Sequence, residues 1–478
     1  MIREKLDAIR QRYHELPVVS KASLWFLACN IIQKSFSLLT TPIFTRLMTR
    51  TQYGVYGIYI SWMQILAIPI VFRLDYAVFN KGMVNFKRER DAYASGMLGF
   101  VTVTTTAALV LYLLFRAQVN AVTELSTPIM LSALAELYGA TAISFWSLRE
   151  KYEFRYKGIV FVTLLTAALN AGLGILAVTQ FEDKATARVL SCAISQVAVG
   201  AVIAFILFRK GKTFWNRTYV RFAIRINIPL LPYYFSTYIV EQSDRIMVQK
   251  LISMEAEALY NAAYTLGGII KIVSGAISGA LIPAQYRQLE KGEYDAVRRG
   301  LLRFLTLMAA VSIGFICIAP ELIWALCGEK YREAVSVIPP VSASVFFVAM
   351  FTILTNIELF YDKKHFSSEI AIVAAVLNLV LNILFIPRMG YVAAAYTTLV
   401  SYMLYAAGHI FYAGRTLSAK TGSNPIPVRQ LVLLGGGVLL GCVASRVLYQ
   451  MTVVRYAVAA LLLVLLIVKR KQITAFLK

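Results

Sequence analysis

The chain has 478 residues, of which 59% are hydrophobic and only 15% are charged, and its mean hydropathy is +0.66. This composition is too apolar for an ordinary soluble domain and indicates a protein of the lipid bilayer. The 48 lysines and arginines against 25 acidic residues give a formal charge of +23. In a membrane chain such an excess is expected in cytoplasmic loops, so a nucleic-acid-binding function is disfavoured.

Apolar segments follow one another from the first twenty residues to the end of the chain. Residues 1–21 are charged and amphipathic, and the apolar stretch after them is too long for a signal-peptide core, so we expect a cytoplasmic N-terminus that is retained. With about 20 residues per crossing, the rest of the chain predicts about fourteen transmembrane helices. They lie near 22–44, 54–79, 94–115, 126–148, 158–180, 188–208, 226–250, 258–282, 301–327, 335–360, 367–386, 390–413, 429–449 and 454–469. The predicted fold class is therefore an all-α polytopic membrane protein.

The loop charges indicate how these helices are oriented. With a cytoplasmic N-terminus, lysines and arginines favour the inner loops over the outer loops by about three to one, as the positive-inside rule requires. Both termini are then cytoplasmic, in a multi-pass protein of a bacterial or archaeal plasma membrane. The loops are short and leave no room for a soluble catalytic domain.

A faint internal repeat divides the chain into two similar halves. The stretch from Arg46 to Tyr56 resembles the stretch from Lys250 to Tyr260, six predicted spans later, which predicts parallel repeats of six helices. The predicted domains are the N-terminus 1–21, an N-lobe 22–208, a basic cytoplasmic linker 209–225, a C-lobe 226–414, a cytoplasmic linker 415–428, and an extra helix pair with a basic cytoplasmic tail, 429–478.

Ionisable side chains inside the predicted spans are the candidate functional residues, because each costs on the order of 3 kcal/mol to insert. The deepest are Lys34, Glu136, Glu241, Asp244, Arg245 and Lys271. Arg73, Asp75 and Glu358 lie within about two turns of a cytoplasmic helix end, where a long side chain can reach the headgroups. The five cysteines, Cys29, Cys192, Cys317, Cys327 and Cys442, form no CxxC pair or Cys/His cluster, so we expect no disulfide, metal site or cofactor.

Helical spacing gathers these residues into polar stripes on three helices, and the stripes predict a shared lumen. The stripes are Asn30, Lys34, Ser37 and Thr41; Tyr234, Tyr238, Glu241 and Arg245, with Asp244 close by; and Tyr264, Lys271, Ser274 and Ser278. Two other interpretations remain open. Small polar residues also mediate helix packing in membranes, and Glu241, Asp244 and Arg245 also fit a local ion pair that fixes one helix.

A lumen with deep cations favours an anionic substrate, because arginine and lysine are natural phosphate partners. Tyrosines such as Tyr234 and Tyr238 suit stacking on sugars, although tyrosine is as common at helix interfaces. The carboxylates are candidates for coupling transport to a proton or Na⁺ gradient: Glu136, Glu241, Asp244 and Asp75.

Three stretches resemble a known family of transporters. TTPIFTRLMTRTQYGVYGIYISW (Thr40 to Trp62), SDRIMVQKLISMEAEALYNAAY (Ser243 to Tyr264) and GYVAAAYTTLVSYM (from Gly390) are similar to regions of Wzx-type polysaccharide flippases. These flippases belong to the multidrug/oligosaccharidyl-lipid/polysaccharide (MOP) exporter superfamily. The resemblance identifies the polysaccharide branch and leaves the cargo open.

The resemblance implies two six-helix lobes in a V, as in MATE transporters, that alternate between inward-open and outward-open states. The cargo would be an undecaprenyl-pyrophosphate-linked oligosaccharide, such as an O-antigen repeat unit for lipopolysaccharide. It would move from the cytoplasmic to the outer leaflet, with other polysaccharide-assembly membrane proteins as neighbours. In related flippases, basic residues on helices one, two, seven and eight bind the pyrophosphate, and here those helices carry Lys34, Arg73, Arg245 and Lys271. We expect a monomer.

Three alternatives stay open. The extra helix pair looks like that of lipid II flippases, so a lipid II flippase is one alternative, and a MATE-like drug or cation antiporter of the same fold is another. The third is a membrane glycan polymerase or glycosyltransferase. We expect no enzyme, because the outer loops are short and the histidines His14, His365 and His409 are isolated in the sequence.

Overall fold

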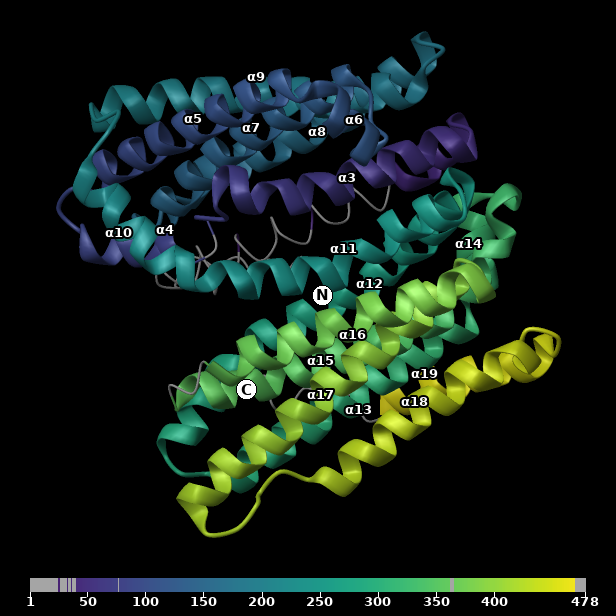
Figure 1. Ribbon diagram of the computed structural model, residues 1–478. Helices are drawn as coiled ribbons and strands as arrows, with labels where there is room; N and C mark the ends of the chain where they lie inside the picture. Colours follow the sequence, from purple (N-terminus) through teal and green to yellow (C-terminus); the bar gives the residue numbers. More distant parts are fainter. Residues whose placement is uncertain are drawn as a thin grey trace, which may run out of the picture. The chain divides into compact units, whose positions relative to one another are not determined.

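The computed structural model describes residues 40–75, 77–361 and 365–468, together with Trp25, Ile32 and Phe36. The regular structure of this described part is helical, as predicted. Ten of its helices are long and apolar enough to cross a membrane (Figure 1). They comprise α3 (Arg50–Val71), α5 (Arg90–Leu114), α7 (Thr127–Tyr152), α8 (Tyr156–Gln180), α9 (Lys184–Gly211), α12 (Met254–Glu290), α13 (Tyr294–Cys317), α15 (Ile338–Phe360), α16 (His365–Met389) and α18 (Val428–Leu448).

Three more predicted spans are also helices but are shorter or more polar. They are α11 (Leu231–Leu251), α17 (Val392–Thr421) and α19 (Thr452–Val468). The remaining predicted span, 22–44, lies mostly outside the described residues, so the total of fourteen stays a prediction. The shorter elements are α4 (Val78–Asn85), α6 (Arg116–Thr123), α10 (Arg217–Asn227), α14 (Ala319–Cys327) and the 3-10 helices η1 (Ile228–Leu230) and η2 (Glu329–Val337).

The predicted span 54–79 is wrong at its C-terminal end, because α3 ends at Val71. Phe72 and Arg73 adopt positive φ angles of 56° and 45°, and side chains at such angles cannot continue a right-handed helix. The Asn227 side chain fixes this turn by donating to the Phe72 carbonyl at 2.7 Å. Arg73 and Asp75 therefore lie in a turn rather than on a membrane helix.

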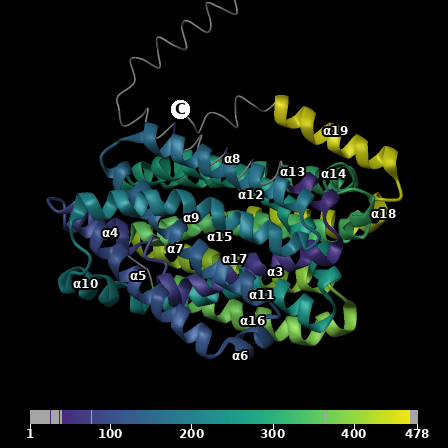
Figure 2. The same cartoon turned by 90° about the horizontal axis from the view of Figure 1, so that it is seen from above.

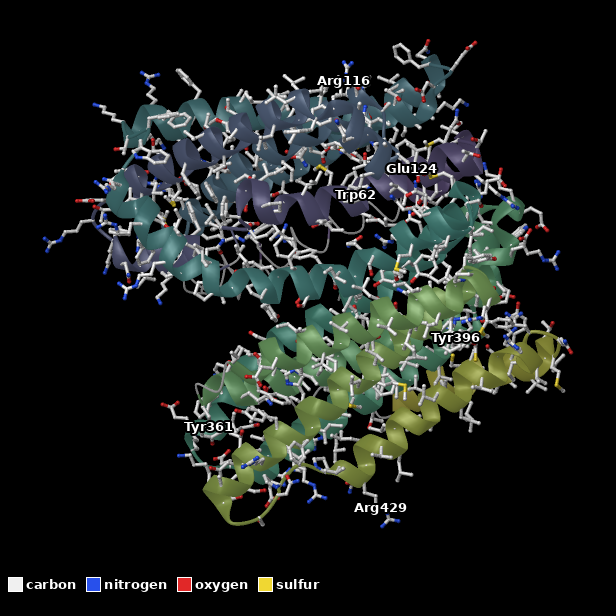
Figure 3. The ribbon with its side chains drawn as sticks, in the orientation of Figure 1. Trp62, Arg116, Glu124, Tyr361, Tyr396 and Arg429 are labelled. Atoms are coloured by element: carbon white, nitrogen blue, oxygen red, sulfur yellow. The ribbon has the colours of Figure 1, made fainter. Side chains whose placement is uncertain are left out.

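The chain forms two compact units. Unit 1 comprises residues 1–40 and 62–231, and unit 2 comprises residues 41–61 and 232–478. Helix α3 begins in unit 2 and ends in unit 1, and Trp62 is its first residue in unit 1 (Figure 3). The lobe boundaries predicted from the repeat stay a prediction.

Within unit 1, helices α5, α7, α8 and α9 pack side by side (Figure 1). Helices α7 and α9 approach closely at Gly139 and Gly200, where a Cβ atom on Gly200 would lie 2.5 Å from the Gly139 Cα. Only glycine allows this distance, and small residues at crossings are typical of membrane helices. The short helices α4 and α10 pack against each other beside α5.

Unit 2 is built around α12, α13, α15, α16 and α17, with the extra helices α18 and α19 packed on α13 (Figure 2). Arg455 of α19 is 4% exposed and grips Glu321 of α14 through two hydrogen bonds of 2.6 and 2.7 Å. It also donates to the Cys317 carbonyl at 2.9 Å. A bidentate arginine thus attaches the C-terminal pair to the rest of the unit.

Candidate functional site

Two of the predicted deep cations meet at one tyrosine ring in unit 2. The Cζ atom of Arg245 lies 4.5 Å from the centre of the Tyr264 ring, and the Nζ atom of Lys271 lies 5.2 Å from it. Tyr264 and Lys271 are two turns apart on α12 and share a face, while Arg245 comes from α11. Such cation–π contacts hold positive charge without neutralising it. We call Arg245, Tyr264 and Lys271, with Glu241, the cation cluster.

The Glu241 carboxylate pairs loosely with Lys271. Its Oε1 lies 3.6 Å from the lysine Nζ, and both side chains are about one-third exposed, at 35% and 31%. A direct charge-assisted hydrogen bond would be about 2.8 Å long, so Lys271 keeps donors for another acceptor. The alternative of a local ion pair on α11 is not what the described residues form. Glu241 pairs across helices, and Arg245 donates to Gln242 at 2.8 Å.

Asp244 points into a separate buried network. Its carboxylate is fully buried and accepts hydrogen bonds from Tyr260, from Thr398 at 3.4 Å and from the Arg245 backbone at 2.8 Å. Behind Thr398 the network continues through buried side chains of α11, α16 and α17, namely Asn378, Asn382, Ser243 and Thr397. A carboxylate among hydroxyl and amide oxygens is an environment that can hold a proton or a hard cation. We call this set the Asp244 network.

Apart from Asp244, the members of this network were not predicted from the sequence, because they carry no charge. Asn378 and Asn382 are one turn apart in the otherwise apolar stretch 370–386, and this spacing was the available signal. In the described part of the chain, no group of three His, Cys, Asp or Glu side chains is placed to bind a metal ion.

Glu257 is a second functional candidate that the sequence analysis missed. It is fully buried on the first turn of α12, and neither of its oxygens has a hydrogen-bond partner among the described residues. Its predicted span began at residue 258, so it was counted as a loop residue. A buried carboxyl group without a partner is costly as an anion, so we take Glu257 as the neutral acid.

Helix α3 lies in close contact with the first turn of α12. A Cβ atom on Gly57 would lie 2.4 Å from the Glu257 Oε1, and one on Gly54 would lie 2.3 Å from the Met254 carbonyl oxygen. At Gly54 the nearest atom belongs to the backbone, so a larger residue there must displace α12, whereas at Gly57 the side-chain ends of Glu257 and Asn261 would have to move. We call this close approach the α3–α12 contact.

His409 is not isolated, contrary to the prediction. Its Nδ1 lies 2.8 Å from Oε1 of Glu358, and both side chains are fully buried. Ser367 donates to the other Glu358 oxygen at 3.3 Å. Glu358 therefore does not extend to the headgroups. The pair joins α15 to α17 across 51 residues of sequence, a distance that no helical spacing reveals.

The other predicted site residues are scattered over both units. Arg73, Asp75 and the half-buried Glu136 belong to unit 1. In unit 2, Thr41 and Tyr234 are buried, and Tyr238 and Ser274 are half-buried. Lys34, Asn30 and Ser37 lie outside the described residues. The structure thus brings together Glu241, Arg245, Tyr264 and Lys271, while the roles of all these residues stay predictions.

Comparison with known proteins shows the family to which the chain belongs. Residues 19–289, more than half of the chain, match the family described as "Polysaccharide biosynthesis protein". The probable low-salt glycan biosynthesis flippase Agl15 of Haloferax volcanii is 20% identical over 438 residues, which is 88% of this chain and 89% of that protein. The uncharacterized membrane protein MJ1068 of Methanocaldococcus jannaschii is 25% identical over 215 residues, and this match spans only 42% of that protein.

Solved structures agree on the fold. The lipid II flippase MurJ, in an inward closed conformation, superposes with a TM-score of 0.71 over 94% of this chain and 99% of that chain, at 11% identity. An inward-facing multidrug MATE transporter of the MOP superfamily superposes with a TM-score of 0.58 over 81% and 98%, at 14% identity. At such identities the likeness shows the fold alone.

These findings confirm the resemblance to Wzx-type flippases and a multi-pass membrane protein. In line with the expectation that the chain is no enzyme, Agl15 and MurJ are named as flippases and the MATE protein is named as a transporter. The chain belongs to the polysaccharide biosynthesis protein family, and its fold resembles that of MurJ and of MATE transporters of the MOP superfamily.

Proposed function

We propose that this flippase moves an undecaprenyl-pyrophosphate-linked oligosaccharide from the cytoplasmic to the outer leaflet of the plasma membrane by alternating access. In this proposal the chain crosses the membrane fourteen times, its helices form two six-helix lobes, and both termini are cytoplasmic. It is supported by the family, by the loop charges and above all by one observation. Arg245 and Lys271 are held at the same ring within a membrane helix pair, where deep cations require a functional reason.

The loose Glu241–Lys271 pair supports a binding step by exchange. A diphosphate oxygen that approaches Lys271 displaces Glu241 from its 3.6 Å contact and takes the free lysine donors. Arg245 adds a second positive charge beside the same ring. When the diphosphate leaves, Glu241 returns to Lys271, so the carboxylate competes with the cargo and prevents it from staying bound.

We also propose that Asp244 binds the coupling ion, a proton or Na⁺. Asp244 and Arg245 are adjacent in sequence, with one in the buried network and the other in the cation cluster. Loading an ion at Asp244 changes the charge next to the cluster, and this links the gradient to cargo affinity. Glu241 stays a second candidate, and Glu136 and Asp75 stay predictions in unit 1.

The remaining predicted lumen residues keep their proposed roles. Lys34 and Arg73 are proposed as further pyrophosphate partners. Sugar contacts are proposed for Asn30, Ser37, Thr41, Tyr234, Tyr238, Tyr264 and Ser274. A monomer suffices for this mechanism, and other polysaccharide-assembly membrane proteins are proposed as neighbours.

Transport of labelled undecaprenyl-diphosphate oligosaccharide in liposomes tests the proposal. Translocated cargo is measured by its protection from a glycan-cleaving enzyme added outside. Lys271→Ala should lower the rate at least tenfold, because a charge-assisted contact contributes about 1.5–3 kcal/mol. Lys291→Ala is the matched control, since Lys291 is an exposed lysine in the turn after the same helix. Equal rates for wild type and Lys271→Ala would contradict the proposed role of the cluster.

Glu241→Gln tests the exchange step. Without the competing carboxylate, the cargo should bind more tightly and leave more slowly, so the apparent affinity should rise while turnover falls. Unchanged values of both would contradict the exchange.

Because of these carboxylates, one alternative function stays open, that of a MATE-like antiporter. Export of a cationic dye in the same liposomes, lost in Asp244→Asn and unaffected by Lys271→Ala, would favour it. A lipid II flippase is distinguished by offering lipid II and the oligosaccharide cargo in competition.

A further inference from the structure

A basic groove of about 470 Å³ lies along α4 and α10 in unit 1. Its lining includes Lys81, Asn85, Arg217, Arg221, Phe222 and Arg225, and none of the residues that line it is acidic. Four cations therefore share one depression in which no lining residue offsets their charge. The cation cluster of unit 2 does not include any of them.

The sequence of α10 places three of these cations on one face. Arg217, Arg221 and Arg225 follow one another at intervals of four residues, so they lie along one side of the helix. Like charges at this spacing repel one another. The helix is held in spite of this repulsion by the opposite face, where Tyr219, Val220 and Ala223 are buried.

Helix α10 is packed against the rest of unit 1. Tyr219 donates to the Glu89 carboxylate at 2.5 Å, and the rings of Phe86 and Tyr93 pack against Tyr219 and Phe222. Asn216 caps the start of α10 by accepting from the Thr218 backbone at 2.9 Å. The backbone that carries the three arginines of α10 is thus in place before any ligand arrives, and only their exposed side chains have to be ordered on binding.

The flanks of α10 indicate that the ligand is a lipid rather than a free anion. Phe214 and Trp215 precede the helix and Ile228 follows it, and these side chains are 51%, 49% and 55% exposed. Exposed aromatic and aliphatic residues beside a basic helix face are typical of a helix that lies in the headgroup region of a bilayer.

We propose that this groove binds the phosphate headgroup of an anionic phospholipid of the surrounding bilayer. The headgroup phosphate lies among the arginines, and Phe214, Trp215 and Ile228 enter the interface beside it. Through η1, α10 continues into α11, the helix that carries Arg245. A bound phospholipid therefore fixes the start of the helix that holds part of the cation cluster. The proposal does not depend on the identity of the cargo.

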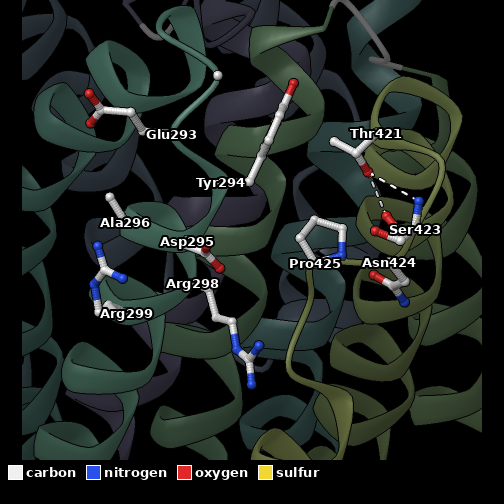
Figure 4. Close-up of a pocket in the computed structure, with 11 residues that line it drawn as sticks. Glu293, Tyr294, Asp295, Ala296, Arg298, Arg299, Thr421, Ser423, Asn424 and Pro425 are labelled. Atoms are coloured by element: carbon white, nitrogen blue, oxygen red, sulfur yellow. Dashed lines mark hydrogen bonds between the residues drawn. The ribbon is translucent and has the colours of Figure 1, made fainter.

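A second pocket, of about 580 Å³ in unit 2, provides the matched control. Arg298 and Arg299 line it together with Glu293 and Asp295, so its charges balance (Figure 4). Lys291, Arg298 and Arg299 are exposed, and their removal lowers the net charge by the same amount as removal of the three α10 arginines.

The test measures lipid binding to the purified full-length protein in zwitterionic detergent. The thermal unfolding midpoint is followed while phosphatidylglycerol or phosphatidylcholine is added. Phosphatidylglycerol should raise the midpoint of the wild type, and phosphatidylcholine should not. Each cation near an anionic lipid contributes about a fivefold gain in binding. The variant Arg217→Gln/Arg221→Gln/Arg225→Gln should therefore bind phosphatidylglycerol about 100-fold more weakly.

The control variant Lys291→Gln/Arg298→Gln/Arg299→Gln should bind like the wild type, and the triple Arg→Lys variant of α10 should keep most of the binding. If the triple Gln variant of α10 does not unfold cooperatively, the single variant Lys81→Gln is measured instead. Its binding of phosphatidylglycerol should be about fivefold weaker than that of the wild type.

Three results would overturn the proposal. An equal loss in both triple Gln variants would show a general charge effect. A midpoint shift with inorganic phosphate as large as that with phosphatidylglycerol would make the groove a site for free anions. Groove-dependent binding of undecaprenyl diphosphate, without binding of phosphatidylglycerol, would assign the groove to the cargo.

Discussion

The α3–α12 contact predicts a specific effect of adding one methyl group at Gly54. A Cβ atom there would lie 2.3 Å from the Met254 carbonyl oxygen and 2.9 Å from the Met254 Cγ. The carbonyl belongs to the backbone and cannot rotate away. Since ordinary van der Waals contact begins near 3.4 Å, Gly54→Ala must separate the two helices by about 1 Å. Overpacking of this kind costs about 1–3 kcal/mol.

In the proposed topology, Gly54 and Met254 lie at the outer ends of their helices, so this separation opens unit 2 between α3 and α12 at that end. A cost of about 2 kcal/mol shifts the opening equilibrium about 30-fold. The assay is the labelling rate of Asn261→Cys, a position that is 7% exposed, by an impermeant maleimide in a cysteine-free background. Labelling should rise about 30-fold in Gly54→Ala, because the thiol reacts when the contact opens.

Gly268→Ala is the control, since a Cβ atom on Gly268, further along α12, would meet nothing within 4 Å. Its labelling rate should equal that of the wild type. Equal labelling in Gly54→Ala and Gly268→Ala would refute the reasoning, because it would mean that the helices absorb the methyl group without opening.

Three further predictions concern single contacts. In Glu257→Gln the labelling of Asn261→Cys should follow thiolate formation alone, as it does for an exposed cysteine, whereas in the parent labelling should rise more steeply with pH as the buried acid ionises; identical pH profiles of the two would contradict this. Burial first, and then the Glu89 carboxylate, raise the pKa of Tyr219 from 10.0 to about 12, so its contribution to stability is complete below pH 10 and is lost toward pH 12. In a variant in which Trp215 is the sole tryptophan, the fluorescence emission of Trp215 should change between pH 10 and pH 12, and it should change less when Tyr219→Phe is added. Equal changes with and without Tyr219→Phe would exclude the Tyr219 contribution. Arg455→Gln should weaken the attachment of α19 by about 1–2 kcal/mol, seen as faster proteolysis between α18 and α19, and an unchanged cleavage rate would count against it.

The helices and the faces of the site helices could be predicted from the sequence. Apolar length revealed most of the spans, and spacing placed Tyr264 and Lys271 on one face of α12. Helix α11 is instructive, because Glu241, Asp244 and Arg245 make it too polar to count as a span by hydropathy. The residues that give a transport helix its chemistry also weaken the apolar signal by which such helices are found.

The partners across helices could not be predicted. Spacing along α11 left open a local ion pair among Glu241, Asp244 and Arg245, whereas Glu241 pairs with Lys271 of α12. Likewise, Arg455 donates a hydrogen bond to Glu321, which lies in a distant part of the sequence. Such pairs depend on which helices become neighbours, and a single sequence carries no direct measure of that. Glu257 was missed for a different reason, because helix ends are the least certain part of any prediction from sequence.

The division of α3 between the two units affects whether each half of the chain can fold when it is produced alone. The segment 41–61 is encoded in the first half of the gene but belongs to the compact unit formed by the second half. A first half produced alone would expose the Gly54 and Gly57 surface of α3, and a second half produced alone would lack a helix that covers its Glu257. Two polypeptides made by cutting the chain in the loop after Gly211 are therefore complementary fragments, each supplying what the other needs to finish folding.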